Sequence, residues 1–379
     1  MKIIRLFALV TLIVAVVLLF RELDKQKKML SDEEIREYAA QMLMVGFKGD
    51  SIDRYGDAAR YVRDLKVGGI ILFDVDLTGD ATVGSRNITS VGQLKKLTSD
   101  LQSFADYKLL ISVDQEGGRV MRLKEQYGFS PTVSAEYMGQ VNNPDTTRFY
   151  AGRIAREMEE VGLNINLAPL LDIHNPECPV IGKLHRSFSA DTAVITNISR
   201  DFIKAHRNHN VLCAVKHFPG HGSATDDSHY DLADVTNTWS RSELAPYRDL
   251  IKDGDLDMVM TAHIFNRQLD TEYPATLSKK MLTGVLREEL GFEGVIVTDD
   301  LYMKGIIDKY DIRDAVVLAI NAGADILLMG NNISTGFEES RPFRVVDMIF
   351  DAVKSGEISQ DRLRESHERI EALKLKLKD

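Results

Sequence analysis

The chain has 379 residues, of which 44% are hydrophobic and 27% are charged, and this composition excludes a disordered or collagen-like protein. Acidic residues outnumber basic residues by 57 to 47, so the chain lacks the concentrated lysine and arginine that bind phosphate backbones, and we expect no nucleic-acid partner. Two cysteines, Cys178 and Cys213, are too few for a disulfide scaffold or a cysteine-based zinc module.

The first five residues include two basic ones, Lys2 and Arg5, and a run of fifteen apolar or near-apolar residues, 6–20, follows. This pattern is typical of an export signal or a membrane anchor. The run ends in bulky residues rather than the small ones that cleavage needs, so residues 1–21 predict an uncleaved transmembrane helix. Basic residues after the run outnumber those before it, which by itself argues against export. We expect a protein anchored at the cell envelope, with the remainder of the chain outside the cytoplasm.

Residues 22–30 predict a charged, solvated linker. From residue 31 to residue 379, short runs rich in Val, Ile and Leu alternate with longer amphipathic segments, which is typical of βα units and a parallel sheet. Eight runs predict strands: 41–47, 67–73, 109–113, 163–171, 211–215, 258–262, 295–298 and 324–329. Helices are predicted at 90–104, 146–161, 190–208, 278–290, 312–322 and 341–354, with a closing amphipathic helix over 362–378.

Eight such strands in one domain predict an α/β fold, a single (β/α)8 TIM-type barrel that follows the N-terminal transmembrane helix. A doubly wound dinucleotide-binding sheet is the alternative, but no Gly-x-Gly-x-x-Gly or Walker-type lysine loop follows any of the runs. Polar residues after the strands favour the barrel, because strand ends converge on the face where barrel active sites are built. These residues are Asp114, Asp172, Lys216, His217, His263 and Asp299.

The densest cluster of titratable residues is the segment 216–229, KHFPGHGSATDDSH. Packing does not readily explain so many such groups in one glycine-containing loop. We expect Lys216 and His217, at a strand end, to face a bound polar ligand. Asp227 and His229 are two residues apart, so in an extended segment their side chains lie on the same side and can share a hydrogen bond. A carboxylate fixes the tautomer of an imidazole and favours its protonated form, which makes His229 a candidate general acid/base.

Two further motifs place acids at strand ends. Adjacent acids in a strand point to opposite faces, so of Asp299 and Asp300 we expect only the first to face the site. A carboxylate in this position can act as a nucleophile, a metal ligand or an acceptor for sugar hydroxyls. Asp114 can accept two hydroxyl hydrogen bonds, as from a vicinal diol. Arg122 and Arg186 are candidates either for ligand binding or for ion pairs within their loops.

Taken together, these motifs resemble glycoside hydrolase family 3, and specifically its β-N-acetylglucosaminidase (β-hexosaminidase) branch, over residues 31–379. Five motifs occur in family order: DQEGGRV at 114–120, NLAPLLD at 166–172, RSF at 186–188, the segment 216–229, and TDDL at 298–301. The segment 216–229 is the most specific, because in this branch an Asp-His dyad replaces the carboxylic acid/base of most retaining glycosidases.

The resemblance implies a retaining exo-β-N-acetylglucosaminidase that needs no metal or cofactor. It implies Asp299 as the nucleophile and His229, oriented by Asp227, as the acid/base. It also implies a set of contacts to the terminal N-acetylglucosamine: Asp114, Arg122, Arg186, Lys216 and His217. Together with the anchor, it suggests cell-wall or peptidoglycan-derived glycans as substrates, with chitin oligosaccharides as the alternative.

Other functions remain open. Within the class, the chain could be a β-N-acetylglucosaminide phosphorylase, in which phosphate replaces water, or a family 3 β-glucosidase. A metal-dependent barrel hydrolase would use His217, His221, His263 and Asp299, but it also calls for a His-x-His pair at the first strand, and residues 41–47 contain no histidine. A membrane-tethered glycan-binding protein without catalysis is the remaining alternative.

Overall fold

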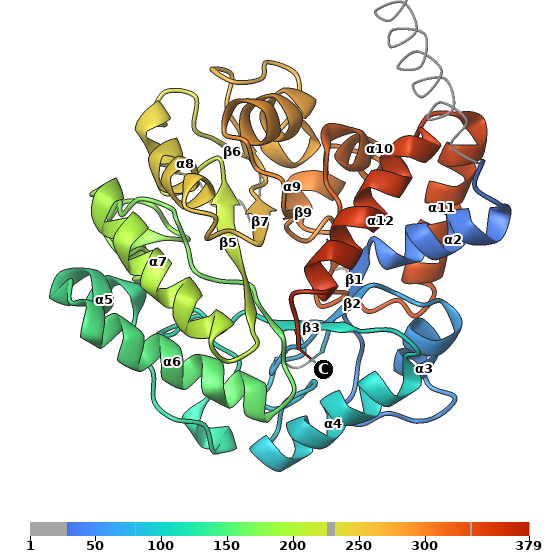
Figure 1. The fold of residues 1–379 in the computed structure, drawn as a ribbon, viewed down its shortest axis with the longest axis horizontal. Coiled ribbons are helices and arrows are strands. Elements are labelled where there is room, and N and C mark those ends of the chain that lie inside the picture. The colour runs from blue at the N-terminus through green and yellow to red at the C-terminus, as the bar shows by residue number, and fades with distance from the viewer. Residues whose placement is uncertain (1–28, 80, 226–231, 334–335, 379) are drawn as a thin grey trace, which may run out of the picture.

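A computed structural model describes residues 29–79, 81–225, 232–333 and 336–378 (Figure 1). The predicted transmembrane segment, residues 1–21, lies outside these residues, as do Asp227 and His229. Within the described ranges, no helix has both the length and the apolar character needed to cross a membrane.

Eight parallel strands form a barrel at the centre of the molecule (Figure 1). They are β1 (Leu43–Val45), β2 (Gly69–Ile71), β3 (Leu110–Val113), β4 (Ile165–Asn166), β5 (Leu212–Phe218), β7 (Met258–Thr261), β9 (Val295–Val297) and β10 (Leu327–Met329). Each strand pairs with its neighbour in chain order, and β1 pairs with β10, where Leu43 lies opposite Leu327. A parallel bridge between Val297 and Ile326 joins β9 to the start of β10. The predicted TIM-type (β/α)8 barrel is therefore confirmed.

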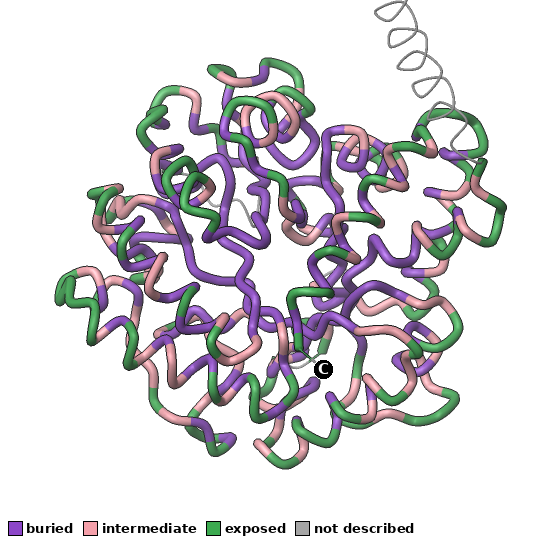
Figure 2. Tube along the Cα trace, in the orientation of Figure 1, coloured by how far each residue is buried: buried purple, intermediate pink, exposed green. Residues whose placement is uncertain are grey.

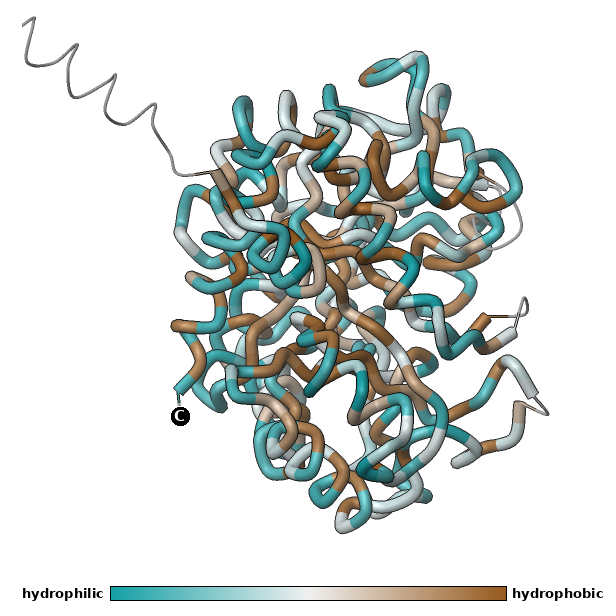
Figure 3. The backbone as a smooth tube through the Cα atoms, turned by 90° about the vertical axis from the view of Figure 1, so that its right-hand side faces the viewer, coloured by the Kyte–Doolittle hydropathy of each residue, from teal (hydrophilic) through white to brown (hydrophobic). Residues whose placement is uncertain are grey.

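The strands are buried along their length, which explains their composition. All residues of β1, β3, β5 and β7 are buried, for example. Strands covered on both faces read as continuous apolar runs instead of alternating ones. Figure 2 shows the buried segments at the centre and exposed segments at the rim, and Figure 3 shows hydrophobic segments running through the middle of the molecule.

Helices surround the barrel, and several begin at a Ser, Asp or Asn whose side chain accepts a hydrogen bond from the first turn, as Ser90 does from the Gln93 N–H. The α-helices are α2 (Asp32–Gln41), α3 (Asp57–Ala59), α4 (Val91–Phe104), α5 (Ala135–Val141), α6 (Pro144–Glu160), α7 (Thr192–Arg207), α8 (Ala245–Lys252), α9 (Lys304–Ile307), α10 (Ile312–Ala322), α11 (Arg341–Ser355) and α12 (Gln360–Lys374). Two π-type helices, η1 (Arg60–Asp64) and η6 (Lys280–Glu289), and short 3-10 turns complete the set: η2 (Glu125–Tyr127), η3 (Gly182–Leu184), η4 (Arg241–Leu244) and η5 (Ala275–Leu277). A two-stranded ladder, β6 (Ala233–Asp234) with β8 (Ile264–Phe265), lies outside the barrel.

All eight strands have bounds that differ from their predictions, and two of these differences bear on the pocket. The run 163–171 forms only two strand residues, whereas β5 continues past the predicted 211–215 to include Lys216 and His217. The segment after β4 nevertheless stays paired with β5. The Lys216 N–H donates to the Pro169 carbonyl at 3.2 Å, and the Lys216 carbonyl accepts the Leu171 N–H at 2.7 Å. The two polar side chains are thus held on a strand rather than on a loop.

One buried carboxylate connects the last helix to the barrel. Asp325, just before β10, is fully buried. Its carboxylate accepts hydrogen bonds from Arg287 at 2.6 Å, Arg362 at 3.0 Å and Arg369 at 3.2 Å. It also accepts the N–H of Ile296 in β9 at 3.0 Å. This carboxylate therefore fixes η6, α12 and the seam between β9 and β10 to one another.

Candidate active site at the carboxyl ends of the strands

A pocket of about 270 Å³ opens at the carboxyl ends of the barrel strands. Its volume lies just below the usual range for ligand sites, roughly 300–1,000 Å³, and suits a single sugar ring. Apolar side chains including Ile71, Met260 and Met303 line part of it. The charged and polar lining includes every predicted site residue that the structure describes: Asp114, Arg122, Arg186, Lys216, His217 and Asp299.

Lys216 is the centre of an ion-pair network in this pocket. Its side chain is only 2% exposed, and its Nζ lies 2.8 Å from both Asp114 Oδ1 and Glu116 Oε1. Arg186 donates to both carboxylate oxygens of Glu116 at 2.8 Å, and Arg122 donates to Asp114 Oδ2 at 3.2 Å. Three cations thus surround two carboxylates. Hydrogen bonds between charged groups of this kind hold side chains in defined positions.

The charges of this network stabilise one another against burial. Burial disfavours ionisation of Asp114, but the charges of Lys216 and Arg122 hold the pKa of this carboxyl well below its usual range. Glu116 shows the same balance, and Arg186 and Lys216 lower its pKa. The carboxylates in turn raise the pKa of Lys216 in spite of its burial. All these groups are therefore charged at neutral pH and can present fixed donors and acceptors to sugar hydroxyls.

Asp172 orients the end of β5. It is fully buried, and its Oδ2 lies 2.7 Å from Nδ1 of His217. Its Oδ1 accepts the backbone N–H groups of His217 at 3.2 Å and His221 at 2.7 Å. Although burial opposes ionisation, His217 lowers the pKa of Asp172. Burial lowers the pKa of His221 to about 4, so that ring is neutral at physiological pH. The carboxylate thus fixes both the His217 ring and the backbone of the segment that follows.

The two adjacent acids after β9 both line the pocket, so the prediction that only Asp299 faces the site is wrong, although their contacts differ. Asp299 is partly exposed and lines the pocket, and its Oδ1 accepts the N–H of Asp300 at 2.8 Å. The carboxylate of Asp300 accepts the N–H groups of Tyr302 at 2.9 Å and Gly330 at 3.0 Å. Burial, with a contribution from the Asp299 charge, raises the pKa of Asp300 to about 6. Asp300 thus ties the Asp299 backbone to the end of β10.

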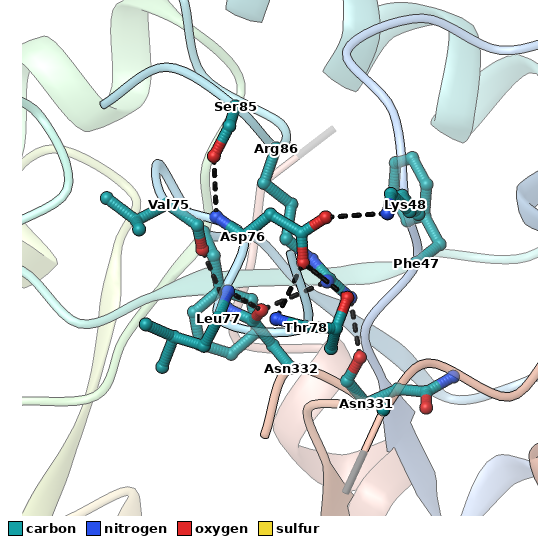
Figure 4. Close-up of polar contacts among 12 residues, drawn as sticks. Phe47, Lys48, Val75, Asp76, Leu77, Thr78, Ser85, Arg86, Asn331 and Asn332 are labelled. Atoms are coloured by element: carbon teal, nitrogen blue, oxygen red, sulfur yellow. Dashed lines mark hydrogen bonds and ion pairs between the residues drawn. The ribbon is translucent and has the colours of Figure 1, made fainter. Parts of the chain in front are cut away.

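A buried arginine holds one wall of the pocket. Arg86 is wholly buried, and its Nη1 donates to Asp76 Oδ1 and to Asn332 Oδ1, both at 3.0 Å (Figure 4). Lys48 approaches the other oxygen of Asp76 at 2.8 Å. Asn332 and Phe73 line the pocket. The network therefore connects the loops after β1, β2 and β10 into one wall.

Glu116 is a site residue that the sequence analysis missed, although a signal was present. It lies two residues after Asp114, and side chains two apart in an extended segment lie on the same side. Its role as the acceptor shared by Arg186 and Lys216 depends on residues 70 and 100 positions away. That pairing could not be read from the local pattern.

In the part of the chain that the structure describes, no three or more His, Cys, Asp or Glu side chains form a group able to hold a metal ion. His263 belongs to the metal-dependent alternative considered above. Its Nδ1 lies 2.8 Å from the Thr276 hydroxyl, and its Nε2 lies 2.9 Å from the Asp300 carbonyl. Both of its ring nitrogens therefore lie within hydrogen-bonding distance of neighbouring protein groups.

The fold and the pocket define a TIM-barrel protein with a charged, monosaccharide-sized site at the carboxyl ends of its strands. The model of the glycosyl hydrolase family 3 N-terminal domain matches residues 34–373. The chain therefore belongs to glycoside hydrolase family 3.

Similar proteins include β-hexosaminidases. Beta-hexosaminidase A of Pseudoalteromonas piscicida is 36% identical over 335 residues, which are 82% of this chain and 54% of that protein. A beta-hexosaminidase of Neisseria meningitidis serogroup C is 34% identical over 294 residues, 75% of this chain and 77% of that protein. The structure of a family 3 beta-N-acetylglucosaminidase from Paenibacillus sp. FPU-7 superposes with a TM-score of 0.81 at 34% identity, covering 92% of this chain and 63% of that one. The chain thus spans about half the length of the Pseudoalteromonas protein and under two thirds of the Paenibacillus chain.

Proposed function

We propose that this protein is a retaining exo-β-N-acetylglucosaminidase. The observation that carries the proposal is the small pocket in which Asp299 faces a network of buried, charged donors and acceptors. A site of this size accepts one terminal sugar, which suits an enzyme that cleaves from the chain end. Family membership and the β-hexosaminidases among the similar proteins support this substrate class.

Hydrolysis with retention needs a nucleophile and an acid/base. In the proposed first step, Asp299 attacks the anomeric carbon, and His229 gives its proton to the departing glycosidic oxygen. In the second step, His229 takes a proton from water, which displaces Asp299 and releases the sugar. In this proposal the role of Asp227 is to orient His229. Both residues of this dyad are assigned from the sequence motif.

The remaining groups bind the sugar. Asp114 and Lys216 can bind adjacent hydroxyls, with Asp114 accepting and Lys216 donating. Arg122, Arg186 and His217 add donors around the ring. Because Lys216 is already bonded to two carboxylates, it requires no reorganisation on binding, which is the condition for tight electrostatic recognition.

The experiment that tests this proposal is hydrolysis of para-nitrophenyl β-glycosides. We expect the N-acetylglucosaminide to be cleaved much faster than the glucoside, at the same rate with and without phosphate. Asp299→Asn should abolish turnover, while Asp308→Asn, at an exposed acid directly after α9, should not. A fluorinated N-acetylglucosaminide should label Asp299. A label on another residue, or a strict need for phosphate, would reassign the chemistry.

We further propose that residues 1–21 anchor the enzyme at the cell envelope, with the barrel outside the cytoplasm, where peptidoglycan-derived fragments are its substrates. The basic and then apolar pattern of this segment supports the anchor. Activity should sediment with membranes and resist a carbonate wash, and protease added to intact spheroplasts should degrade the barrel. Recovery in the soluble fraction would contradict the anchor, and faster cleavage of chitin oligosaccharides would contradict the substrate.

A further inference from the structure

A buried glutamate lies behind the segment that follows β5. Glu243 belongs to the 3-10 turn η4 and is only 1% exposed. Its Oε1 accepts the Ser240 N–H at 3.2 Å as part of a capping box. Its Oε2 faces Gly220, because a Cβ placed on that glycine would lie 2.7 Å from this oxygen. Gly220 has a φ of +124°, so neither the backbone conformation nor the available space admits a side chain.

Residues on both sides of η4 also contact residues 218–223. The indole N–H of Trp239 donates to the Pro219 carbonyl at 3.1 Å. Tyr247, in α8, packs edge-on against Phe218, with ring centroids 5.2 Å apart. On the opposite side, a Cβ on Gly222 would lie 2.0 Å from the Ile173 carbonyl. The segment is thus held between the loop after β4, which contains Ile173, and the residues in and around η4.

Glu243 Oε2, the Ser223 hydroxyl and the Tyr247 hydroxyl are enclosed and have no close hydrogen-bond partner among the described residues. The Ser223 hydroxyl is near enough to Glu243 to lower the pKa of its carboxyl. A carboxylate in such a place is costly unless a cation pairs with it. The charged group that acts on Glu243 is Asp172, which is also negative. Arg241, on the same turn, pairs with Glu289 at the surface. A neutral carboxylic acid satisfies these surroundings better, since its proton can be donated to a neighbouring oxygen.

We propose that Glu243 is a positioning residue that, as a neutral carboxylic acid, supports residues 219–225 from behind, and that its ionisation weakens this support. The effect on catalysis rests on the proposed function, because this segment leads directly to Asp227 and His229. Glu243 itself does not line the pocket, so it acts through the segment and not on the sugar.

The direction of the pH effect follows from the environment. Burial, with a smaller contribution from the Asp172 charge, raises the pKa of Glu243 to about 7, although the Ser240 N–H and the Ser223 hydroxyl act to lower it. Above that pH the folded enzyme carries a buried, unpaired charge, and turnover falls. Between the ordinary glutamate pKa of about 4.3 and this value, the folded state holds a proton that the unfolded chain has released. Glu243 therefore makes stability decline as the pH rises through this window and adds no further slope above it.

Three variants test the proposal. Glu243→Gln is a permanently neutral isostere, Glu243→Ala removes the support, and Glu289→Gln is a control that changes an exposed acid paired with the same turn. We expect Glu243→Gln to keep the kcat of the wild type near pH 6 and to decline less steeply than the wild type above pH 7, where loss of the His229 proton still limits both proteins. Glu243→Ala should lower kcat about tenfold with little change in KM. The control should follow the wild type throughout.

A second readout does not depend on activity. Urea unfolding between pH 5 and pH 8 should show a stability decline in the wild type that Glu243→Gln lacks, and Ser223→Ala should alter that decline while still folding. An unchanged alkaline limb and an unchanged stability slope in Glu243→Gln would overturn the proposal, as would a Glu243→Gln chain that does not fold. If the wild type cleaves no N-acetylglucosaminide but the stability slopes differ as expected, the proposed function fails while the role of Glu243 in folding stands.

Discussion

At the scale of single residues, Asp172 has the widest influence in the site. Its buried carboxylate lies within hydrogen-bonding distance of Nδ1 of His217 and accepts the backbone N–H groups of His217 and His221. The sequence predicts Asp172 at the end of a strand but indicates no role for it. Its partners are 45 and 49 residues away, so the role emerges only from the barrel, which brings neighbouring strand ends together.

Replacing Asp172 with Asn keeps the shape but turns one acceptor oxygen into a donor. The NH2 group of the new asparagine side chain must face either the His217 ring or the two backbone N–H groups, so one of these two contacts is lost. We expect kcat/KM to fall by about 10²-fold, the usual effect of a displaced site group. Asp249→Asn, an exposed acid on α8, is the matched control. Steady-state kinetics check this prediction, and wild-type kinetics in the Asp172 variant would contradict it.

The lowered pKa values of Asp114, Glu116 and Asp172 predict an acid limit to stability. Each folded-state pKa lies below its unfolded value of about 4, so the stabilisation is fully present above that pH. It is lost as the pH falls through the folded values, because the unfolded chain then takes up protons first. Urea unfolding from pH 6 to pH 2 should show a steep decline that begins near pH 4. Glu116→Gln should make the decline shallower, and an equal slope would refute this assignment.

At the scale of elements, predictions succeeded where packing alone determines the structure. Helix α10 begins and ends at the residues predicted for it, Ile312 and Ala322, and every apolar run gave a barrel strand. The failures lie where long-range pairing decides the length of an element. β5 is extended to Phe218 by its neighbours on both sides, while the backbone after β4 leaves the regular ladder. A local apolar pattern contains no information about such neighbours.

The Arg86 network predicts how the pocket wall responds to mutation. Arg86→Met removes the donor shared by Asp76 and Asn332. It leaves the buried Asp76 carboxylate with the Lys48 ion pair and two hydrogen bonds from Thr78. We expect a stability loss of about 3–5 kcal/mol and a higher KM, because Asn332 and Phe73 lose their support. Arg54→Met, at an exposed position, should change neither. Thermal unfolding and steady-state kinetics measure the two effects, and an unchanged KM would show that the wall does not contact the substrate.

At the scale of the whole molecule, one end of the barrel forms the candidate active site and the other end contributes to stability. The pocket and its charges lie at the carboxyl ends of the strands, whereas Asp325 and its arginines lie at the amino end. This division is the usual one in barrels of this type. It could be predicted from the sequence in outline, since the polar residues follow the strands. The partners of Asp325 could not, because they come from η6 and α12, between 37 and 44 residues away.

Asp325→Ala should therefore affect stability without affecting chemistry. The change leaves three arginines around an empty site, and we expect a loss of about 3–5 kcal/mol in the free energy of unfolding. At temperatures well below the midpoint, kcat and KM should match the wild type. Asp351→Ala, at an exposed position of α11, provides the control. A large loss of kcat in a folded Asp325→Ala protein would show that the two ends are coupled.

The pairing of β1 with β10 also has a consequence for biosynthesis. Leu43 finds its partner Leu327 only after most of the polypeptide has been translated, and Asp325 meets Arg362 and Arg369 later still. On the ribosome, the emerging strands therefore expose an apolar edge until the final helices leave the exit tunnel. We therefore expect ribosomes stalled before residue 325 to carry a protease-sensitive product.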